Sequence, residues 1–206
     1  QVPLVKSRYL EYINNEEHPN GENAIVAIMC YSGYNVEDSI LFNEAAVKRG
    51  LFNITYYNMY EDCEESSNTG AAMVAGTGSR TSTHFSNMSN SASVRGINPD
   101  HNYAHLDAYG IIKENTELDD HTVVIGKISR SADSPDESRD TSTIAKKGQA
   151  GYVDRAYMTE SERGTRLAKV RVRDHRYPAV GDKFCSRCGQ KGTVGFIVPE
   201  RDMPFT

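Results

Sequence analysis

The chain has 206 residues and a net charge of -5, with 38% hydrophobic and 25% charged residues. This length can bury the core of one or two domains, and the composition excludes an intrinsically disordered chain. No apolar run approaches the ~20 residues that a membrane-spanning helix needs, and no secretory leader is recognisable, so we expect no membrane association. The four cysteines are fewer than a disulfide-built secreted domain usually carries, which favours a reducing compartment.

The first part of the sequence predicts two short strands and one helix. The apolar run over residues 24–29 indicates a buried strand, and residues 39–42 indicate a second strand. Asn43 is suited to accept hydrogen bonds from the first turn of a helix over residues 44–49, which Gly50 would end.

The rest of the sequence predicts β-structure around a polar middle segment. Residues 61–102 begin acidic and are then dominated by Ser, Thr, Asn and Gly, which is typical of loops, and residues 129–139 read as a polar link. Alternation is sharp near residue 170, where Val170 and Val172 would face a core and basic residues the opposite side. Strands are predicted over residues 122–128, 151–158, 168–173 and 192–198.

Basic residues concentrate near the end of the sequence. Residues 168–206 carry eight Lys/Arg and four Asp/Glu, which leaves residues 1–167 at -9. Within this part, residues 181–193 contain three glycines, Lys183, Lys191 and Arg187. Glycines let a backbone approach a ligand closely, and cationic side chains suit phosphate. The pattern indicates phosphate handling, with an ordinary basic turn between strands as the alternative.

Two further motifs raise the question of metal binding. Glu37 and Asp38 follow a turn, and adjacent carboxylates can attract a divalent cation. On a strand they would point to opposite faces, which disfavours direct binding of one ion by both and leaves a solvated acidic turn as the alternative. Cys185 and Cys188 have the spacing of half a zinc site or of a redox pair, but no second pair of ligands is placed by spacing, so we predict no zinc.

Nine stretches carry a resemblance to a known family, and they match it in order and spacing along essentially the whole chain. The stretches are residues 23–28, 31–39, 49–52, 134–137, 169–173, 181–184, 186–187, 189–193 and 202–206. Together they resemble the second-largest subunit of multisubunit DNA-directed RNA polymerases, of the RNA polymerase II and large-DNA-virus type and the counterpart of the bacterial β subunit. Because the first residue is Gln and the last residues resemble mid-protein sequence, an internal fragment is expected, with processing or tag removal as the alternative explanation of Gln1.

The resemblance implies a mainly β fold with minor α. Residues 1–53 and 174–206 would be two parts of the hybrid-binding region, a partial double-psi β-barrel that this chain leaves incomplete. Residues 54–173 would be the inserted wall, or flap.

The resemblance also implies chemistry, namely DNA-templated RNA synthesis in which a 3′-hydroxyl attacks an α-phosphate between two metal ions. The largest subunit would hold the main Mg²⁺, which accounts for the lack of an Asp-x-Asp-x-Asp run here. Glu37 and Asp38 match the acidic pair that approaches the second magnesium, through water. The lysines and their neighbours match groups near the RNA 3′ end and the incoming nucleotide. These are Lys183 and Lys191 as catalytic and binding residues, with Arg187 and Gln190 along the same path.

One position departs from the family, which commonly has His where this chain has Cys188. A thiol cannot replace a cationic imidazole. One hypothesis is that a self-splicing insert once preceded Cys188, since splicing requires Cys, Ser or Thr there; drift to Cys is the simpler alternative.

The expected partners are the largest and other polymerase subunits, the DNA template, the RNA–DNA hybrid, ribonucleoside triphosphates, and transcription factors at the wall. The setting would be the nucleus for a cellular protein, or the host cytoplasm, viral factory or virion for a large DNA virus. The fragment alone would be inactive. Two alternatives stay open: a non-catalytic, wall-like binding module for transcription factors and nucleic acid, and a metal-dependent nuclease using Glu37 and Asp38, which would need further carboxylates.

Overall fold

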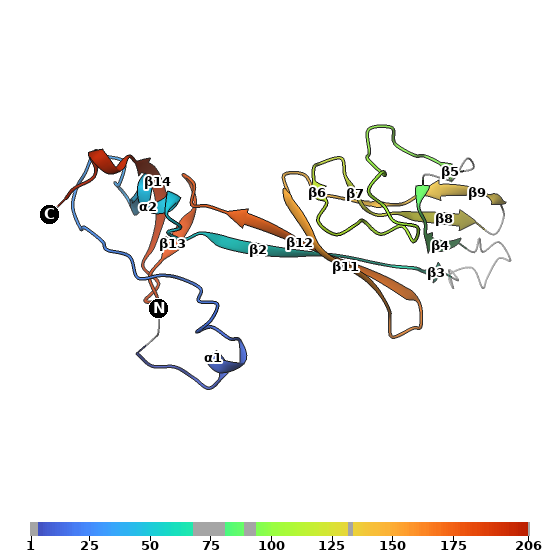
Figure 1. Cartoon of the computed structure of the whole chain (residues 1–206), viewed down its shortest axis with the longest axis horizontal. Helices are drawn as coiled ribbons and strands as arrows, with labels where there is room; N and C mark the ends of the chain where they lie inside the picture. The colour runs from blue at the N-terminus through green and yellow to red at the C-terminus, as the bar shows by residue number, and fades with distance from the viewer. Residues whose placement is uncertain (1–3, 68–80, 89–93, 132–133, 206) are drawn as a thin grey trace, which may run out of the picture. The chain divides into compact units, whose positions relative to one another are not determined.

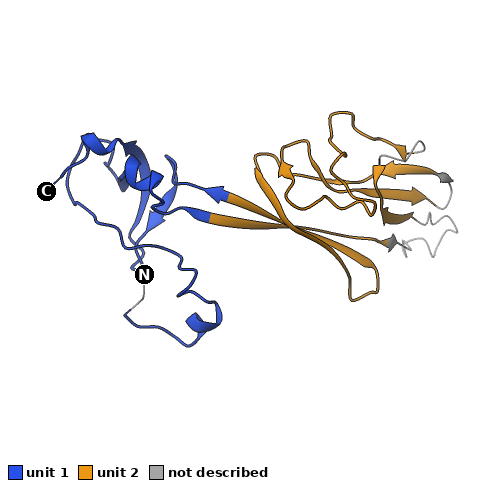
Figure 2. Cartoon of the chain, in the orientation of Figure 1, with its two compact units in different colours: residues 1–54, 175–206 blue, residues 55–174 orange. Residues whose placement is uncertain are grey.

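The computed structural model describes residues 4–67, 81–88, 94–131 and 134–205, and the fold is mainly β as predicted (Figure 1). The chain divides into two compact units (Figure 2). Unit 1 comprises residues 1–54 and 175–206, and unit 2 comprises residues 55–174. The ranges expected from the sequence, 1–53, 54–173 and 174–206, end close to where these two units divide. The assignment of the ranges to a hybrid-binding region and a wall stays a prediction.

Unit 1 is built on a three-stranded sheet of order β1-β14-β13, in which β14 is parallel to β1 and antiparallel to β13. The elements of unit 1 are α1 (Tyr9–Tyr12), β1 (Ser39–Asn43), α2 (Glu44–Lys48), β13 (Lys183–Cys185), β14 (Lys191–Val198) and the 3₁₀ helix η3 (Glu200–Asp202).

None of the helices in the described ranges of either unit has the length and apolar character of a membrane span.

The passage from β1 to α2 follows the predicted signals. The Asn43 side-chain oxygen accepts hydrogen bonds from the N–H groups of Ala45 at 2.9 Å and Ala46 at 3.3 Å. Gly50 lies beyond the helix with φ of +109°, a conformation that costs glycine little. The predicted strand and helix here are confirmed.

The predicted strand over residues 24–29 is wrong for the described chain. These residues form no strand, and Ile25 and Ile28 are 105% and 99% exposed. A strand needs a neighbour that pairs with its backbone N–H and C=O groups. The Asn35 side chain donates a hydrogen bond to the Met29 carbonyl oxygen at 2.7 Å, but a single side chain does not replace a neighbouring strand. The apolar composition of this run predicts a buried strand, but composition alone does not tell which strand would pair with it.

Unit 2 contains a five-stranded sheet, a pair of strands and nearly all of a four-stranded sheet. The four-stranded sheet, in the order β2-β12-β11-β6, contains β2 (Ile54–Cys63), β6 (Glu117–Leu118), β11 (Gly151–Glu160) and β12 (Arg166–Arg176). The five-stranded sheet, in the order β3-β4-β8-β9-β5, contains β3 (Ser66–Ser67), β4 (Thr81–Phe85), β5 (Val94–Arg95), β8 (Lys127–Ser131) and β9 (Ser134–Asp140). β7 (Val123–Ile125) pairs with β10 (Thr143–Ile144).

The core of unit 2 confirms the predicted alternation in β12. Val170 and Val172 are 0% and 1% exposed and pack with buried residues of β7 and β11. On the opposite side, the Lys169 ammonium lies 2.7 Å from a Glu61 carboxylate oxygen and Arg171 lies 2.6 Å from Asp154.

Two predictions for unit 2 need correction. Residues 129–139 are not a link, because β8 and β9 pair as antiparallel strands there; their sequence is polar and gave no apolar alternation. The strand expected over residues 122–128 is broken between β7 and β8 at Gly126.

Residues 61–102, which were expected to be rich in loops, also contain β4, which pairs with β8. Residues 68–80 and 89–93 of this range lie outside the described residues.

Candidate functional site

The predicted site residues lie on the sheet of unit 1 and on the turns that enter it. Thr193 of β14 is central, because it pairs with Ser39 of β1 on one side and with Lys183 of β13 on the other. The Thr193 backbone N–H also donates to the Asp38 carbonyl oxygen at 2.9 Å. Early and late segments of the sequence therefore meet in one row of this sheet.

The sheet places Lys183 and Lys191 on the same face. Lys183 lies opposite Thr193, and Lys191 lies opposite Cys185. Paired residues, and residues two apart along a strand, point to the same side, so the lysines are diagonal neighbours, which lie about 7–8 Å apart with their Cβ atoms somewhat closer. Both side chains are exposed, and neither forms an ion pair with another described residue.

The opposite face of these strands is apolar and fixes the direction of the lysines. Val194 is 1% exposed, and the Phe184 ring meets the Phe42 ring edge-on with centroids 4.9 Å apart. If the pairing of β13 shifted by one residue, its two faces would be exchanged and the Lys183 ammonium would enter this cluster. An unpaired charge is strongly unfavourable there. The alternation of charged and apolar residues therefore holds both ammonium groups toward solvent.

A five-residue loop, residues 186–190, joins β13 to β14. The Gly189 N–H donates to the Ser186 carbonyl at 3.0 Å, and the Ser186 N–H donates to the Gln190 carbonyl at 3.2 Å. Gly189 has φ of +84°, which an L-residue adopts only with strain. The loop carries Arg187 near its tip and places exposed Gln190 directly before Lys191.

Glu37 and Asp38 occupy a bend just before β1, not a strand. Their φ angles are +51° and +62°, so the alternation expected of residues on a strand does not apply to their side chains. Both carboxylates are exposed and form no ion pair with either lysine in the described part of the chain. The backbone bond from Thr193 to Asp38 places the acidic bend beside the lysine-bearing strands.

The donor set at this bend fits a metal that arrives with its own ligands. Mg²⁺ prefers oxygen and is commonly held by one or two carboxylates together with water and substrate phosphates. Two adjacent exposed carboxylates can supply such a share. Across the described ranges, no group of three or more His, Cys, Asp or Glu side chains is arranged to hold a metal ion.

Cys185 and Cys188 are both free and exposed, Cys185 at the end of β13 and Cys188 in the loop. The self-splicing hypothesis for Cys188 stays a prediction, and uninterrupted DNA across the codons for Arg187 and Cys188 would dismiss it.

Sequence reasoning missed two features that the sheet reveals. The first is Thr193, which links the acidic bend to both lysine-bearing strands. Its position on a predicted strand, two residues after Lys191, indicated that the two side chains share a face. A depression of about 570 Å³ on unit 1 contains none of the predicted site residues; its lining is Glu44, Val47, Lys48, Tyr177 and Ile197.

Comparison with known proteins gives a consistent result. The family model described as RNA polymerase Rpb2, domain 6 matches residues 1–206. The chain is 38% identical over 214 residues to DNA-directed RNA polymerase subunit Rpo2 of Saccharolobus solfataricus, and 40% identical over 215 residues to DNA-directed RNA polymerase II subunit RPB2 of Encephalitozoon cuniculi. It is also 38% identical over 207 residues to a probable RPB2 homolog of Invertebrate iridescent virus 3.

Each of these alignments covers 100% of this chain, but the chain spans only 18%, 18% and 17% of the three relatives. The similarity therefore concerns one section of much longer proteins.

Proposed function

The chain belongs to the RNA polymerase Rpb2 family, and from this premise we propose that it is part of the second-largest subunit of a DNA-directed RNA polymerase. In the assembled enzyme it contributes to DNA-templated RNA synthesis from ribonucleoside triphosphates. Its own share is contact with the RNA 3′ end, with nucleotide phosphates and with the RNA–DNA hybrid.

The observation that carries this proposal is the placement of Lys183 and Lys191 on one exposed face of β13 and β14. Two ammonium groups that form no ion pair with another described residue attract a polyanion, and their spacing as diagonal neighbours, about 7–8 Å or somewhat less, suits neighbouring phosphate groups. The packed sheet below them fixes the directions in which the two side chains leave the backbone, and their flexible stems let the ammonium groups adjust to phosphate. Positive charge at this position stabilises negative charge that grows during phosphoryl transfer.

The remaining residues take supporting roles in the proposed reaction. Arg187 and Gln190 extend the same path along the loop, where they bind RNA or nucleotide. Glu37 and Asp38 would approach a nucleotide-borne Mg²⁺ through water, and that ion would supply charge neutralisation and alignment of the reacting groups. The principal magnesium belongs to the largest subunit.

The proposed assembly follows from the family. Unit 1 forms the hybrid-binding region around a double-psi β-barrel that the rest of the subunit completes, and unit 2 forms the wall. Partners are the largest and other polymerase subunits, the DNA template and transcription factors. The setting is the nucleus for a cellular enzyme, or the host cytoplasm, viral factory or virion for a viral one.

The test is single-nucleotide addition by the assembled polymerase carrying Lys191→Ala. We expect the rate to fall on the order of tenfold or more, with partial recovery in Lys191→Arg, which keeps the charge. Lys147→Ala, which removes an exposed lysine of unit 2, is the matched control and keeps the rate. Normal elongation of Lys191→Ala with lost binding of a transcription factor would instead support the binding-module alternative.

A second measurement addresses the nuclease alternative. The purified 206-residue chain with Mg²⁺ is expected neither to make nor to cleave RNA. Magnesium-dependent cleavage that Glu37→Gln abolishes would favour the nuclease.

A further inference from the structure

The strand β11 has an edge that is only half covered. On one side β11 pairs with β12 along its length, and on the other side β6 pairs only with Gly151 and Tyr152. Just beyond β6, Val153 donates to the Thr116 carbonyl at 2.9 Å and accepts from the Asn115 N–H at 2.8 Å. After that point, no described strand lies beside the outer edge of β11.

The hydrogen-bonding direction of each residue on this edge follows from its neighbours. The Ala156 N–H donates to a Glu114 carboxylate oxygen at 3.3 Å and so points away from β12. The Ser161 N–H donates to the Thr165 carbonyl across the hairpin at 2.8 Å and so points toward the β12 side. Because direction alternates along a strand, Met158 and Glu160 point their backbone groups away from β12. They form a short open edge that can pair with an additional strand.

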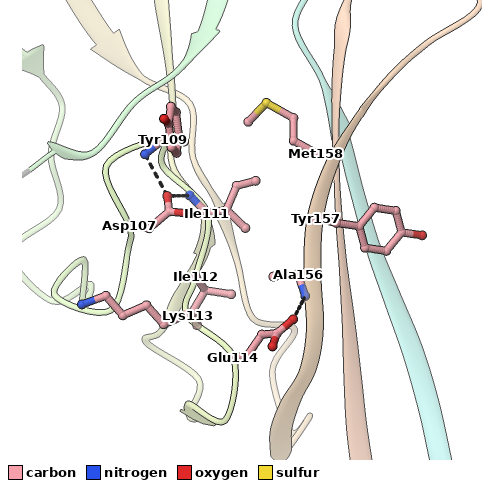
Figure 3. Close-up of a pocket in the computed structure, with 9 residues that line it drawn as sticks. All are labelled: Asp107, Tyr109, Ile111, Ile112, Lys113, Glu114, Ala156, Tyr157 and Met158. Carbon is pink, nitrogen blue, oxygen red and sulfur yellow. Dashed lines mark hydrogen bonds between the residues drawn. The ribbon is translucent and has the colours of Figure 1, made fainter.

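A pocket lies directly beside this edge within unit 2 (Figure 3). It encloses about 400 Å³ between the segment 107–114 and β11. Ile111 and Ile112, which are 5% and 1% exposed, supply its apolar wall on one side, and Met158 supplies apolar surface on the other. Tyr109 is 66% exposed and adds an aromatic ring to the lining.

The charges around the pocket indicate which ligand it suits. Asp107 accepts hydrogen bonds from the N–H groups of Tyr109 at 2.8 Å and Ile111 at 2.9 Å, and Glu114 accepts from Ala156. Each carboxylate keeps its second oxygen and its negative charge. The Lys113 ammonium points away from β11 (Figure 3). The side of the pocket that faces β11 is therefore apolar, with the Glu114 carboxylate beside Ala156 as its charged group (Figure 3).

We propose that the open edge of β11 binds an extended, basic segment of a partner polypeptide, which adds as a strand beside Met158 and Glu160. A partner carbonyl takes the Ala156 N–H from Glu114, and the released carboxylate pairs with a Lys or Arg side chain of the partner. An apolar partner side chain enters the pocket against Ile111 and Met158. Strand addition of this kind gains affinity from main-chain hydrogen bonds and specificity from alternate side chains.

The proposal concerns unit 2 and does not depend on the role proposed for Lys183 and Lys191. Its test uses binding to the 206-residue chain rather than RNA synthesis, so failure of one proposal is distinguishable from failure of the other.

The experiment titrates the chain with acetyl-Lys-Val-Lys-Val-Lys-Val-amide and with the counterpart in which Glu replaces Lys. We expect the basic peptide to bind at least about tenfold more tightly than the acidic peptide and to slow amide exchange at Met158 and Glu160. Met158→Pro removes an outward N–H while leaving the hydrogen bonds to β12 intact, and should weaken the basic peptide about tenfold. Met158→Leu keeps the N–H and the apolar volume and is the matched control.

Because the whole chain is acidic, the variants must separate edge binding from general attraction. Folding of each variant is checked by NMR, from the spread of its backbone amide chemical shifts. If Met158→Pro does not fold, Glu114→Gln gives an independent test: it keeps an acceptor for Ala156, removes the charge, and should weaken the basic peptide about two- to fivefold. Equal binding of both peptides, binding of the basic peptide to folded Met158→Pro or to Glu114→Gln as tight as to the wild type, or dimerisation through this edge without peptide binding would overturn the proposal.

Discussion

Two glycines of β14 allow a matched test of how the acidic bend is held beside the lysine-bearing strands. A Cβ atom at Gly195 would lie 2.1 Å from the Tyr34 carbonyl oxygen, in the turn that leads to Glu37 and Asp38. A Cβ atom at Gly192 would lie 3.0 Å from an Ile40 side-chain carbon and 3.1 Å from the Asp38 carbonyl oxygen. Gly195→Ala therefore requires a backbone shift, whereas Gly192→Ala needs only a small local adjustment.

The expected magnitudes follow from these distances. Overpacking against a backbone atom costs about 1–3 kcal/mol, so Gly195→Ala should speed local opening about 5- to 150-fold, and Gly192→Ala should have a clearly smaller effect. The assay is hydrogen exchange at the Thr193 amide, which is bonded to the Asp38 carbonyl at 2.9 Å. Equal exchange in the two variants would refute the claim that close packing of the turn on β14 holds the bend in place.

Three further outcomes are expected in stability measurements. Val172→Ala removes two methyl groups from a side chain that is 1% exposed, and should lower the free energy of unfolding by about 2–3 kcal/mol in urea titration. Asn43→Ala removes the acceptor for Ala45 and should cost about 1 kcal/mol by the same assay, with Asn43→Ser as control. Burial tends to raise the pKa of Glu64, but hydrogen bonds from Arg166 and from the Phe85 N–H outweigh it and leave the pKa lowered. Glu64 therefore stabilises the fold above its unfolded pKa of about 4.3, and this contribution is lost as the pH falls through the lower folded value; unfolding followed from pH 7 to pH 3 should show a weaker acid destabilisation in Glu64→Gln.

Local signals in the sequence were sufficient where a residue depends on its own neighbours. Asn43 caps α2 because its side chain reaches the next turn, and Val170 and Val172 are buried because alternation puts them on one side of β12. The common face of Lys183 and Lys191 depends on the five-residue loop that sets the register of β13 against β14. The sequence indicated a basic turn there but not that register.

Features that depend on distant partners could not be predicted in this way. The run over residues 24–29 has the composition of a buried strand, yet no described strand pairs with it. The left-handed conformations of Glu37 and Asp38 arise in the turn, and neither residue type announces them. β8 and β9 were missed because their polar residues pair through the backbone, which leaves little trace in an apolar pattern.

The most direct measurement of the central claim is affinity labelling of the assembled polymerase with a ribonucleoside triphosphate that carries a lysine-reactive aldehyde near its phosphates. The predicted result is that mass spectrometry finds both Lys183 and Lys191 modified, and that excess unmodified triphosphate protects both. Modification confined to other lysines, or labelling of these two that triphosphate does not reduce, would contradict a shared phosphate path on this face of the sheet.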